Sequence, residues 1–470
     1  MLKTQVFTPK EIVKEMLKII DYNKNIFDKK VIDSACGEGN ILMEVVERYI
    51  KFGKELNKSD EDIRKGIEEN IYGVEKDSKC FEKCISNLNK VAARYNLFNI
   101  SWAIFNDDSL KKKYDYKYDY IIGNPPYLKY HDISNREREY IRSRFESCRK
   151  GNFDYYYAFL EKDYNSLNIN GKLIYIIPNN TFKNIFAKKL RHIIKKDTLD
   201  IVDYKNKKIF KNISTSSSLL YIGKNTNSNV INYTNKKTGE ITDIDKDILG
   251  EIWYFDNKFN KNKNKNNIFG DYFHASMSVA TLCNDIFIIK DYMEHDDSVQ
   301  IGKDLIEKNI LKIAISPRSM MRKKKELIIF PYYYNNNSLK KYKEDKLRSL
   351  FPKAFNYLSR HKLKLEQRNS NINTQWFEYG RSQGLNKMNQ TKLILSTLVT
   401  NEVKVYIGGK DSIVYSGIFI VPKKEISIEV AKNILESEEF FRYVQLVGVH
   451  TSGNSIRISA KDINRFPIKL

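Results

Sequence analysis

Two adjacent prolines that stop an apolar run constrain this chain more than any other feature of its sequence. Residues 118–123 form the run and predict a buried strand, and Asn124-Pro125-Pro126-Tyr127 follows it directly. The strand must end there, because proline cannot donate a hydrogen bond to a neighbouring strand and fixes its own φ. The loop therefore holds polar and aromatic groups beyond the carboxyl end of a strand, where open α/β sheets bind their ligands.

The same four residues suit a flat substrate that carries an amino group. The Asn124 side-chain oxygen and the Pro125 carbonyl can accept hydrogen bonds from an exocyclic NH2, and the Tyr127 ring can stack on the ring that bears it. An ordinary turn at the end of a strand is the alternative. The residues at the ends of the neighbouring strands decide between these two interpretations.

The segment that precedes this strand predicts a nucleotide-binding βαβ arrangement. Residues 30–32 predict a short strand and residues 41–52 a helix, and the turn between them contains Gly37 and Gly39. Glycine lets the backbone approach a ligand at the helix N-terminus, and Asp33 at the strand tip can bind a hydroxyl or an ammonium group.

Acidic residues follow the next two predicted strands. Residues 71–74 end in Glu75, which is placed to bind both hydroxyls of a ribose, and residues 102–105 lead to Asp108. Four successive strand ends thus carry Asp33, Glu75, Asp108 and Asn124. Apart from Lys76, no basic residue directly flanks the three carboxylates. This pattern disfavours a phosphate ligand and favours a nucleoside with a cationic tail, such as S-adenosylmethionine.

The N-terminal residues predict the start of a helix. Thr8 is a good N-cap and Pro9 a good first helical residue for a helix over residues 11–20. A helix N-terminus with a hydroxyl and free N–H groups can also bind a carboxylate.

These motifs, in this order, resemble the γ class of DNA N6-adenine methyltransferases. The resemblance lies in Phe7-Thr8-Pro9, Asp33, Ala35-Cys36-Gly37, Gly39, Glu75, Asp108-Ser109-Leu110 and Asn124-Pro125-Pro126-Tyr127. Residues 152–161, 171–179 and 209–216 are similar to that family's fifth, sixth and eighth motifs, whereas Ser34 and Glu38 depart from its common residues. The resemblance implies an α/β fold: a Rossmann-like class I S-adenosylmethionine-dependent methyltransferase domain, followed by a mixed α+β target-recognition domain.

The resemblance also implies a role for each matching residue. The cofactor would be S-adenosylmethionine, held by Phe7, Thr8, Pro9, Asp33, Ala35, Cys36, Gly37, Gly39, Glu75, Lys76, Asp108, Ser109, Asn124, Pro126 and Phe159. The catalytic residues would be Asn124, Pro125, Pro126 and Tyr127, and Tyr127 and Phe210 would stack on the substrate base. Asp107 is an alternative to Asp108 for the same role, and we choose Asp108 because it directly precedes Ser109. For Phe159 and Phe210, an ordinary place in the core is the alternative.

The implied reaction transfers a methyl group from S-adenosylmethionine to adenine N6 in double-stranded DNA. Adenine N6 is a weak nucleophile, because its lone pair is delocalised into the ring. Two acceptors, the Asn124 side-chain oxygen and the Pro125 carbonyl, would favour a more tetrahedral nitrogen that is ready for in-line attack. An adenine inside a duplex is out of reach, so the base must be flipped out of the helix.

The second half of the chain predicts a separate domain, and we place the boundary between residues 1–245 and 246–470. A polar, repetitive stretch over residues 257–267 predicts a linker or a long loop. The segments that resemble target-recognition domains of restriction-modification methyltransferases are residues 276–289, 328–332, 376–383, 453–458 and 466–468.

Basic groups recur through this half, at residues 318–325, 340–343 and 360–368. Beside a base-flipping enzyme they favour phosphate contacts, which position a protein on DNA without reading its sequence. We expect DNA contacts from Arg318, Arg322, Lys323, Arg381 and Gln383. The last two carry side chains of the kind that read base edges. A structural or merely solvated side chain is the alternative for each.

The composition agrees with a nucleic-acid partner. The formal net charge of +23 favours a polyanionic partner, although a lysine-rich composition from an AT-rich genome would give the same excess. Five scattered cysteines argue against disulfides, and Cys80 and Cys84 have no histidine nearby, so we expect buried thiols and no metal site. The sequence has no secretory signal or long apolar segment. We expect a monomer in the bacterial cytoplasm, associated with the nucleoid.

Other interpretations of the catalytic loop stay open. A protein-glutamine or an RNA adenine methyltransferase would share it; the Phe7-Thr8-Pro9 opening and the basic second half argue against the first, and only an assay separates the second. A non-catalytic specificity subunit conflicts with the intact loop. Only six residues precede Phe7, and no nuclease constellation is evident downstream, so we expect any cleavage to come from a separate restriction endonuclease.

Overall fold

The computed structural model describes residues 7–205, 209–210, 216–262, 267–451 and 455–468. The chain forms two compact units, described here one at a time. The first runs to Lys261 and includes His450, and the second begins at Asn262. Residues 246–261, which we expected in the second domain, lie in the first unit, because Leu249 and Trp253 pack into its core.

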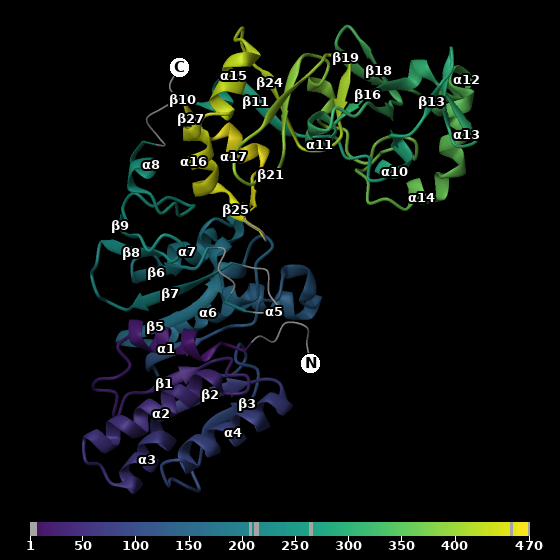
Figure 1. The fold of residues 1–470 in the computed structure, drawn as a ribbon. Coiled ribbons are helices and arrows are strands. Elements are labelled where there is room, and N and C mark those ends of the chain that lie inside the picture. Colours follow the sequence, from purple (N-terminus) through teal and green to yellow (C-terminus); the bar gives the residue numbers. More distant parts are fainter. Residues whose placement is uncertain (1–6, 206–208, 211–215, 263–266, 452–454, 469–470) are drawn as a thin grey trace. The chain divides into compact units, whose positions relative to one another are not determined.

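Nine described strands form one sheet in the first unit (Figure 1, purple to teal). In chain order they are β1 (Val31–Asp33), β2 (Ile71–Glu75), β3 (Ala103–Asn106), β4 (Tyr118–Gly123), β5 (Leu167–Pro178), β6 (Thr198–Asp203), β7 (Ser217–Gly223), β8 (Val230–Asn235) and β9 (Ile241–Asp245). Their order across the sheet is β3-β2-β1-β4-β5-β7-β6-β8-β9. The first five are parallel, and β7 runs antiparallel to β5 and β6. The expected Rossmann-like methyltransferase fold is confirmed.

Helices cover both faces of this sheet. They are α1 (Lys10–Ile19), α2 (Asn40–Glu55), α3 (Asp60–Asn70), α4 (Ser78–Ala93), α5 (Asn135–Arg144), α6 (Tyr156–Ser166), α7 (Lys188–Ile194) and α8 (Asn257–Asn262). The apolar faces of α1–α4 pack with Ile122 in one core, and those of α5–α7 pack with Ile121 in the other. Successive strand residues point to opposite faces, so Tyr120 and Ile122 enter one core and Ile121 enters the other.

Two local expectations are wrong. Helix α1 begins at Lys10 with Pro9 as its N-cap residue, and Thr8 does not cap it; its hydroxyl accepts a hydrogen bond from another loop instead. The first part of the expected linker is α8 rather than a loop, because Asp256 accepts a hydrogen bond from the Phe259 N–H at 2.8 Å and so caps the helix. Residues 263–266 of that stretch lie outside the described residues.

The second unit is a mixture of short sheets and helices, as expected. Its strands are β10 (Asn267–Ile268), β11 (Phe273–Met277), β12 (Ile288–Ile289), β13 (Met293–Glu294), β14 (Ser298–Ile301), β15 (Asp304–Glu307), β16 (Leu311–Ile315), β17 (Glu326–Ile329), β18 (Tyr332–Asn335), β19 (Ser338–Lys341), β20 (Lys392–Leu395), β21 (Leu398–Val399), β22 (Val405–Gly408), β23 (Ser412–Val414), β24 (Ile418–Pro422), β25 (Val449–His450), β26 (Ile456–Arg457) and β27 (Pro467–Ile468). Two four-stranded sheets, β11-β24-β20-β22 and β12-β17-β16-β23, form its centre.

The helices of the second unit are shorter. They are α9 (Phe269–Tyr272), α10 (Asn284–Phe287), α11 (Pro317–Met321), α12 (Glu344–Leu350), α13 (Pro352–Arg360), α14 (Lys362–Glu366), α15 (Ile428–Leu435), α16 (Glu438–Val447) and α17 (Ala460–Asn464). Among the described residues of the whole chain, no helix has both the length and the apolar character that a membrane span requires.

Candidate active site

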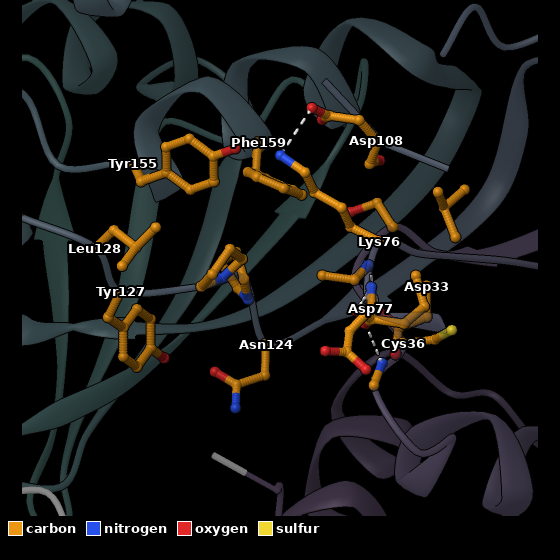
Figure 2. A pocket seen from close by; sticks show the side chains of 18 of the residues that line it. Asp33, Cys36, Lys76, Asp77, Asp108, Asn124, Tyr127, Leu128, Tyr155 and Phe159 are labelled. Atoms are coloured by element: carbon orange, nitrogen blue, oxygen red, sulfur yellow. Dashed lines mark hydrogen bonds and ion pairs between the residues drawn. The ribbon is translucent and has the colours of Figure 1, made fainter. Parts of the chain in front are cut away.

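A cavity of about 510 Å³ opens at the carboxyl ends of the parallel strands of the first unit. Loops that follow β1, β2, β3 and β4 supply most of its walls, together with α5 and α6. The lining residues are Phe7, Thr8, Asp33, Ser34, Ala35, Cys36, Gly37, Asn40, Ile41, Val74, Glu75, Lys76, Asp77, Asp107, Asp108, Ser109, Asn124, Pro125, Pro126, Tyr127, Leu128, Asp132, Ser134, Glu137, Tyr155 and Phe159. Figure 2 shows Asn124 and Tyr127 on one side and Asp33 and Cys36 on the other.

Most of the expected cofactor and catalytic residues therefore meet in one place. Pro9, Gly39 and Phe210 lie outside the lining. Gly39 has a φ of +86°, and a Cβ there would stand 2.8 Å from the Cys84 sulfur, so this glycine shapes the turn by close packing on α4. Phe210 is buried in the core that also contacts Tyr127, and residues 211–215 of the expected eighth motif lie outside the described residues.

The loop after β4 is held in one conformation by its neighbours. The Asn124 side-chain N–H donates to Thr8 Oγ1 at 3.3 Å, which sets the orientation of the amide. The Tyr127 hydroxyl donates to the Ile176 carbonyl at 2.8 Å, and its ring meets the Tyr156 ring edge-on with centroids 5.8 Å apart. Burial raises the pKa of the Tyr127 hydroxyl, which therefore stays protonated. These two contacts hold the Tyr127 ring in its place beside the cavity.

Glu75 joins two of the loops. Its side chain accepts hydrogen bonds from the Gly37 N–H and from the Asp77 N–H, both at 2.8 Å. Gly37 has a φ of +55°, a conformation that favours glycine, and this turn brings its N–H toward the carboxylate. The acidic residue at the tip of β2 thus fixes the turn after β1 as well as lining the cavity.

Asp33 is almost fully buried at the tip of β1. One of its oxygens accepts a hydrogen bond from the Ala35 N–H at 3.1 Å. Burial raises the pKa of the Asp33 carboxyl to about 8, against the opposing effect of that hydrogen bond. A positively charged ligand beside it would restore the ionised form.

Asp108 lies at the other end of the cavity, against a lysine. Lys76 Nζ lies 3.1 Å from one Asp108 oxygen and 3.6 Å from Glu137, as the dashed line to Asp108 in Figure 2 marks. The Tyr155 hydroxyl donates to Glu137 at 2.7 Å and so fixes the second carboxylate. Both carboxylates line the cavity, as does Lys76.

The sequence analysis missed a buried carboxylate behind this cavity. Asp163 of α6 accepts hydrogen bonds from Ser34 Oγ at 2.6 Å and from the Tyr175 hydroxyl. Tyr114 also donates to it at 3.5 Å and lies 2.6 Å from Ser109 Oγ, so Asp163 ties the loops after β1 and β3 to α6. Burial raises the pKa of Asp163 to about 6. A carboxylate four residues after Phe159, on the buried stripe of the helix, was the available signal.

The expected DNA-binding side chains of the second unit are all exposed. Arg381 pairs with Ala280 through backbone hydrogen bonds of 2.9 and 3.0 Å, and the neighbouring Ser278 N–H donates to the Gly417 carbonyl, beside Pro317 at the start of α11. The Arg381 segment and α11, which carries Arg318, thus both flank residues 278–280.

Part of the expected basic surface is used inside the unit. Arg368 donates to the carbonyls of Thr281, Trp376 and Glu378 at 2.6 to 3.0 Å, so it holds backbone rather than phosphate. Lys341 lies 2.6 Å from the buried Glu378. Residues 453–454 of the expected recognition segment over residues 453–458 lie outside the described residues.

Comparisons with known proteins agree with the resemblance expected from the motifs. Residues 40–210 match the family described as the Eco57I restriction-modification methylase. The type II restriction enzyme and methyltransferase RM.Eco57I of Escherichia coli is 23% identical, over 98% of this chain and 56% of that protein. The type II methyltransferase M.HincII of Haemophilus influenzae is 28% identical, over 53% of this chain and 43% of that protein. The chain thus spans about half the length of these relatives.

A solved structure agrees with the fold along nearly the whole chain. The type IIL restriction-modification enzyme MmeI, solved in complex with DNA, superposes with a TM-score of 0.61 at 12% identity, over 96% of this chain and 64% of that one. The likeness covers both units, since so little of the chain lies outside it. The expected resemblance to methyltransferases of restriction-modification systems is confirmed.

Proposed function

Because residues 40–210 match the Eco57I restriction-modification methylase family, we propose that this protein methylates adenine N6 in double-stranded DNA at a specific sequence, with S-adenosylmethionine as the methyl donor. The observation that carries the proposal is the rigid Asn124–Tyr127 loop, which lines the same cavity as three strand-end acids, Asp33, Glu75 and Asp108. Hydrogen-bond acceptors for a base and a site for a nucleoside methyl donor would thus share one cavity.

The chemistry of the cavity fits S-adenosylmethionine. Asp33 suits the ammonium of its methionine part, Glu75 the ribose hydroxyls and Asp108 the adenine amino group, with the Phe159 ring against the purine. The Gly37 turn keeps side chains out of the space beside Phe7, where a Cβ would stand 3.9 Å from that ring. The volume of about 510 Å³ is within the usual range for ligand pockets. When bound, this cofactor supplies an electrophilic methyl group on a sulfonium.

The residues of the loop would prepare the nucleophile. The Asn124 amide is oriented by Thr8, so its oxygen and the Pro125 carbonyl can accept hydrogen bonds from the two N–H groups of adenine N6. This draws the nitrogen toward a tetrahedral geometry with its lone pair directed at the methyl group. As the N–CH3 bond forms, the S–CH3 bond would break with its electron pair left on sulfur, so that S-adenosylhomocysteine is released and the surplus N6 proton passes to water. No covalent enzyme intermediate is needed. Positioning and fixed dipoles do most of the work.

The target base would be held by stacking once it has left the duplex. Tyr127 presents a ring that its hydrogen bond to Ile176 keeps in place, and Phe210 packs in the core on which Tyr127 rests. We assign the Tyr127 ring to the flipped adenine, whereas Phe210, which is 4% exposed and does not line the cavity, has no face open to a base. The exposed Arg318, Arg322, Lys323, Arg381 and Gln383 would hold the duplex, the first three through phosphates.

The experiment that tests this proposal compares substrates. The purified protein is incubated with S-adenosylmethionine and either unmethylated genomic DNA or RNA, and the digested nucleosides are analysed by mass spectrometry. N6-methyladenine in DNA is expected, and sequencing of the modified positions would give the recognition site. Product in RNA alone, or transfer to a glutamine-containing protein instead, would refute the DNA assignment while leaving the cofactor site intact.

A further inference from the structure

A short turn after β5 exposes two large apolar side chains. Ile185 and Phe186 are 55% and 41% exposed, although most residues of their kind in the first unit are buried. Single exposed apolar residues are common and need no explanation, but a neighbouring pair on one turn is a different matter. Three features of its surroundings indicate that the turn is built to present them.

The first feature is a buried arginine that holds the turn from beneath. Arg191 of α7 is only 1% exposed, and it donates to the carbonyls of Thr181 at 2.5 Å and Asn184 at 2.8 Å. The Asn184 side chain in turn accepts from the Phe186 N–H at 3.0 Å and donates to the Tyr157 hydroxyl at 3.1 Å. A charged group that is buried and committed to backbone carbonyls fixes a conformation.

The second feature is a glycine that makes room for the pair. Gly151 has a φ of +77°, and a Cβ at this position would stand 2.2 Å from the Phe186 ring. The ring therefore rests directly on backbone and leaves one side open. The residues before Gly151 are the exposed Arg149 and Lys150, for which the described residues show no ion pair. Exposed apolar side chains beside two cationic side chains suit contact with a nucleic acid, because its phosphates are anionic and the faces of its bases are apolar.

The third feature is a continuous connection to the catalytic loop. Tyr127 meets the Tyr156 ring, whose hydroxyl lies 2.6 Å from Thr181 Oγ1, and the Thr181 carbonyl is bound by the same arginine that holds the tip. Strands β4 and β5 are adjacent and parallel, with Gly123 opposite Tyr175, so both loops emerge at the same edge of the sheet. Continuous contacts thus join the turn that carries Ile185 and Phe186 to the Tyr127 ring.

We infer that Ile185 and Phe186 form a wedge that enters the duplex beside the target adenine and packs on the bases left behind when that adenine flips out. The inference rests on the proposed function, since it names what stabilises the flipped state. Apolar side chains inserted between base steps compensate for lost stacking, and removing a base from the stack is the main cost of reaching it. The wedge acts on the duplex and not on the methyl transfer itself.

The test compares two duplexes that contain the recognition sequence found by sequencing the methylated product. In one the target adenine faces thymine, and in the other it faces an abasic position, which lowers the cost of flipping. The variant is Ile185→Ser/Phe186→Ser. The matched control is Ile169→Ser, which removes a 73% exposed apolar side chain from the opposite end of β5.

For the double variant we expect kcat/KM on the paired duplex to fall about tenfold or more. On the abasic duplex it should stay within about twofold of the unsubstituted protein, and Ile169→Ser should change neither value. An equal loss on both duplexes, or no loss on either, would overturn the wedge. If the double variant does not fold, as judged by calorimetric binding of S-adenosylhomocysteine, Ile185→Ser alone is subjected to the same comparison.

Failure of the proposed function gives a different result. A protein that binds S-adenosylhomocysteine but forms no N6-methyladenine in unmethylated genomic DNA gives no recognition sequence and is not the proposed enzyme. Fluorescence of 2-aminopurine at the target position provides a second measurement that needs no methyl transfer. Its rise on binding should be smaller for the double variant than for Ile169→Ser, and an equal rise would also contradict the wedge.

Discussion

The Asn124 amide nitrogen lies 3.3 Å from Thr8 Oγ1, although the two residues are 116 positions apart in the chain. In the proposed reaction, the threonine hydroxyl would thus select which end of the amide faces the base. Since an amide that has turned over would present N–H groups to another N–H donor, this contact decides whether the loop can accept hydrogen bonds from an amino group.

Replacing that hydroxyl should therefore slow the chemistry. We expect Thr8→Val, which keeps the shape of the side chain, to lower kcat about tenfold, and Thr8→Ser to retain most of it. Steady-state kinetics at saturating cofactor measures both. A Thr8→Val protein with undiminished kcat would show that the amide is oriented by other contacts.

The raised pKa of Asp33 predicts that stability depends on pH. A carboxyl whose pKa is about 8 in the folded state and about 4 in the unfolded state binds more protons when folded. Its contribution to stability is fully present below pH 4 and is lost as the pH rises toward 8. Asp33→Asn should remove this part of the slope, which thermal unfolding at several pH values would detect.

The same carboxyl predicts proton release when the cofactor binds. A bound ammonium favours the ionised form, so at pH 7 binding should release a proton from Asp33 into the buffer. Calorimetric titrations in buffers of different ionisation enthalpy should reveal it, with Asp33→Asn as the control. Equal proton release by both proteins would contradict the proposed place of the ammonium.

Lys76, which the resemblance places among the residues that hold the cofactor, should compete with the cofactor for Asp108. Its ammonium lies 3.1 Å from the carboxylate oxygen that we assign to the adenine amino group, and that ion pair must open or be shared when a purine enters. We expect Lys76→Met, which keeps the aliphatic stem, to bind adenosine and S-adenosylhomocysteine a few-fold more tightly. Weaker binding of adenosine would mean that the ammonium helps to hold the ligand.

Phosphate contacts in the second unit should appear in the salt dependence of DNA binding. Replacing the exposed Lys323 with Gln is expected to reduce the slope of log K against log salt by about 1, with a similar effect on every sequence. Gln383→Ala should leave that slope unchanged and relax specificity. Fluorescence anisotropy titrations over a range of salt concentrations distinguish the two variants. If Lys323→Gln had the same slope as the unsubstituted protein, Lys323 would not contact a phosphate.

Local signals were sufficient to predict the parallel half of the sheet and its cavity. The apolar run before Asn124, the glycine turn after Asp33 and the acid after the second strand are patterns of neighbouring residues, and parallel strands bring their carboxyl ends to one edge. These signals place Glu75 and an acid after the third strand in one cavity, whereas the choice of Asp108 over Asp107 came from the resemblance, and both line the cavity.

Contacts between distant residues could not be predicted in this way. The pairing of Thr8 with Asn124 and the hydrogen bonds that meet at Asp163 depend on tertiary packing. Arg368 was expected on phosphates because charge alone was visible, whereas its partners are backbone carbonyls of the same unit. The wedge residue Ile185 looked like any apolar residue until its exposure was known.

The central claim is that the loop after β4 accepts the hydrogen bonds of an adenine amino group. The most direct measurement is N6-methyladenine formation in unmethylated DNA by the unsubstituted protein and by Asn124→Ala, with S-adenosylmethionine binding to both followed by calorimetry. The account predicts that the variant binds the cofactor within about threefold of normal and forms less than about one hundredth of the product. An Asn124→Ala protein that still methylates DNA at a comparable rate would contradict it.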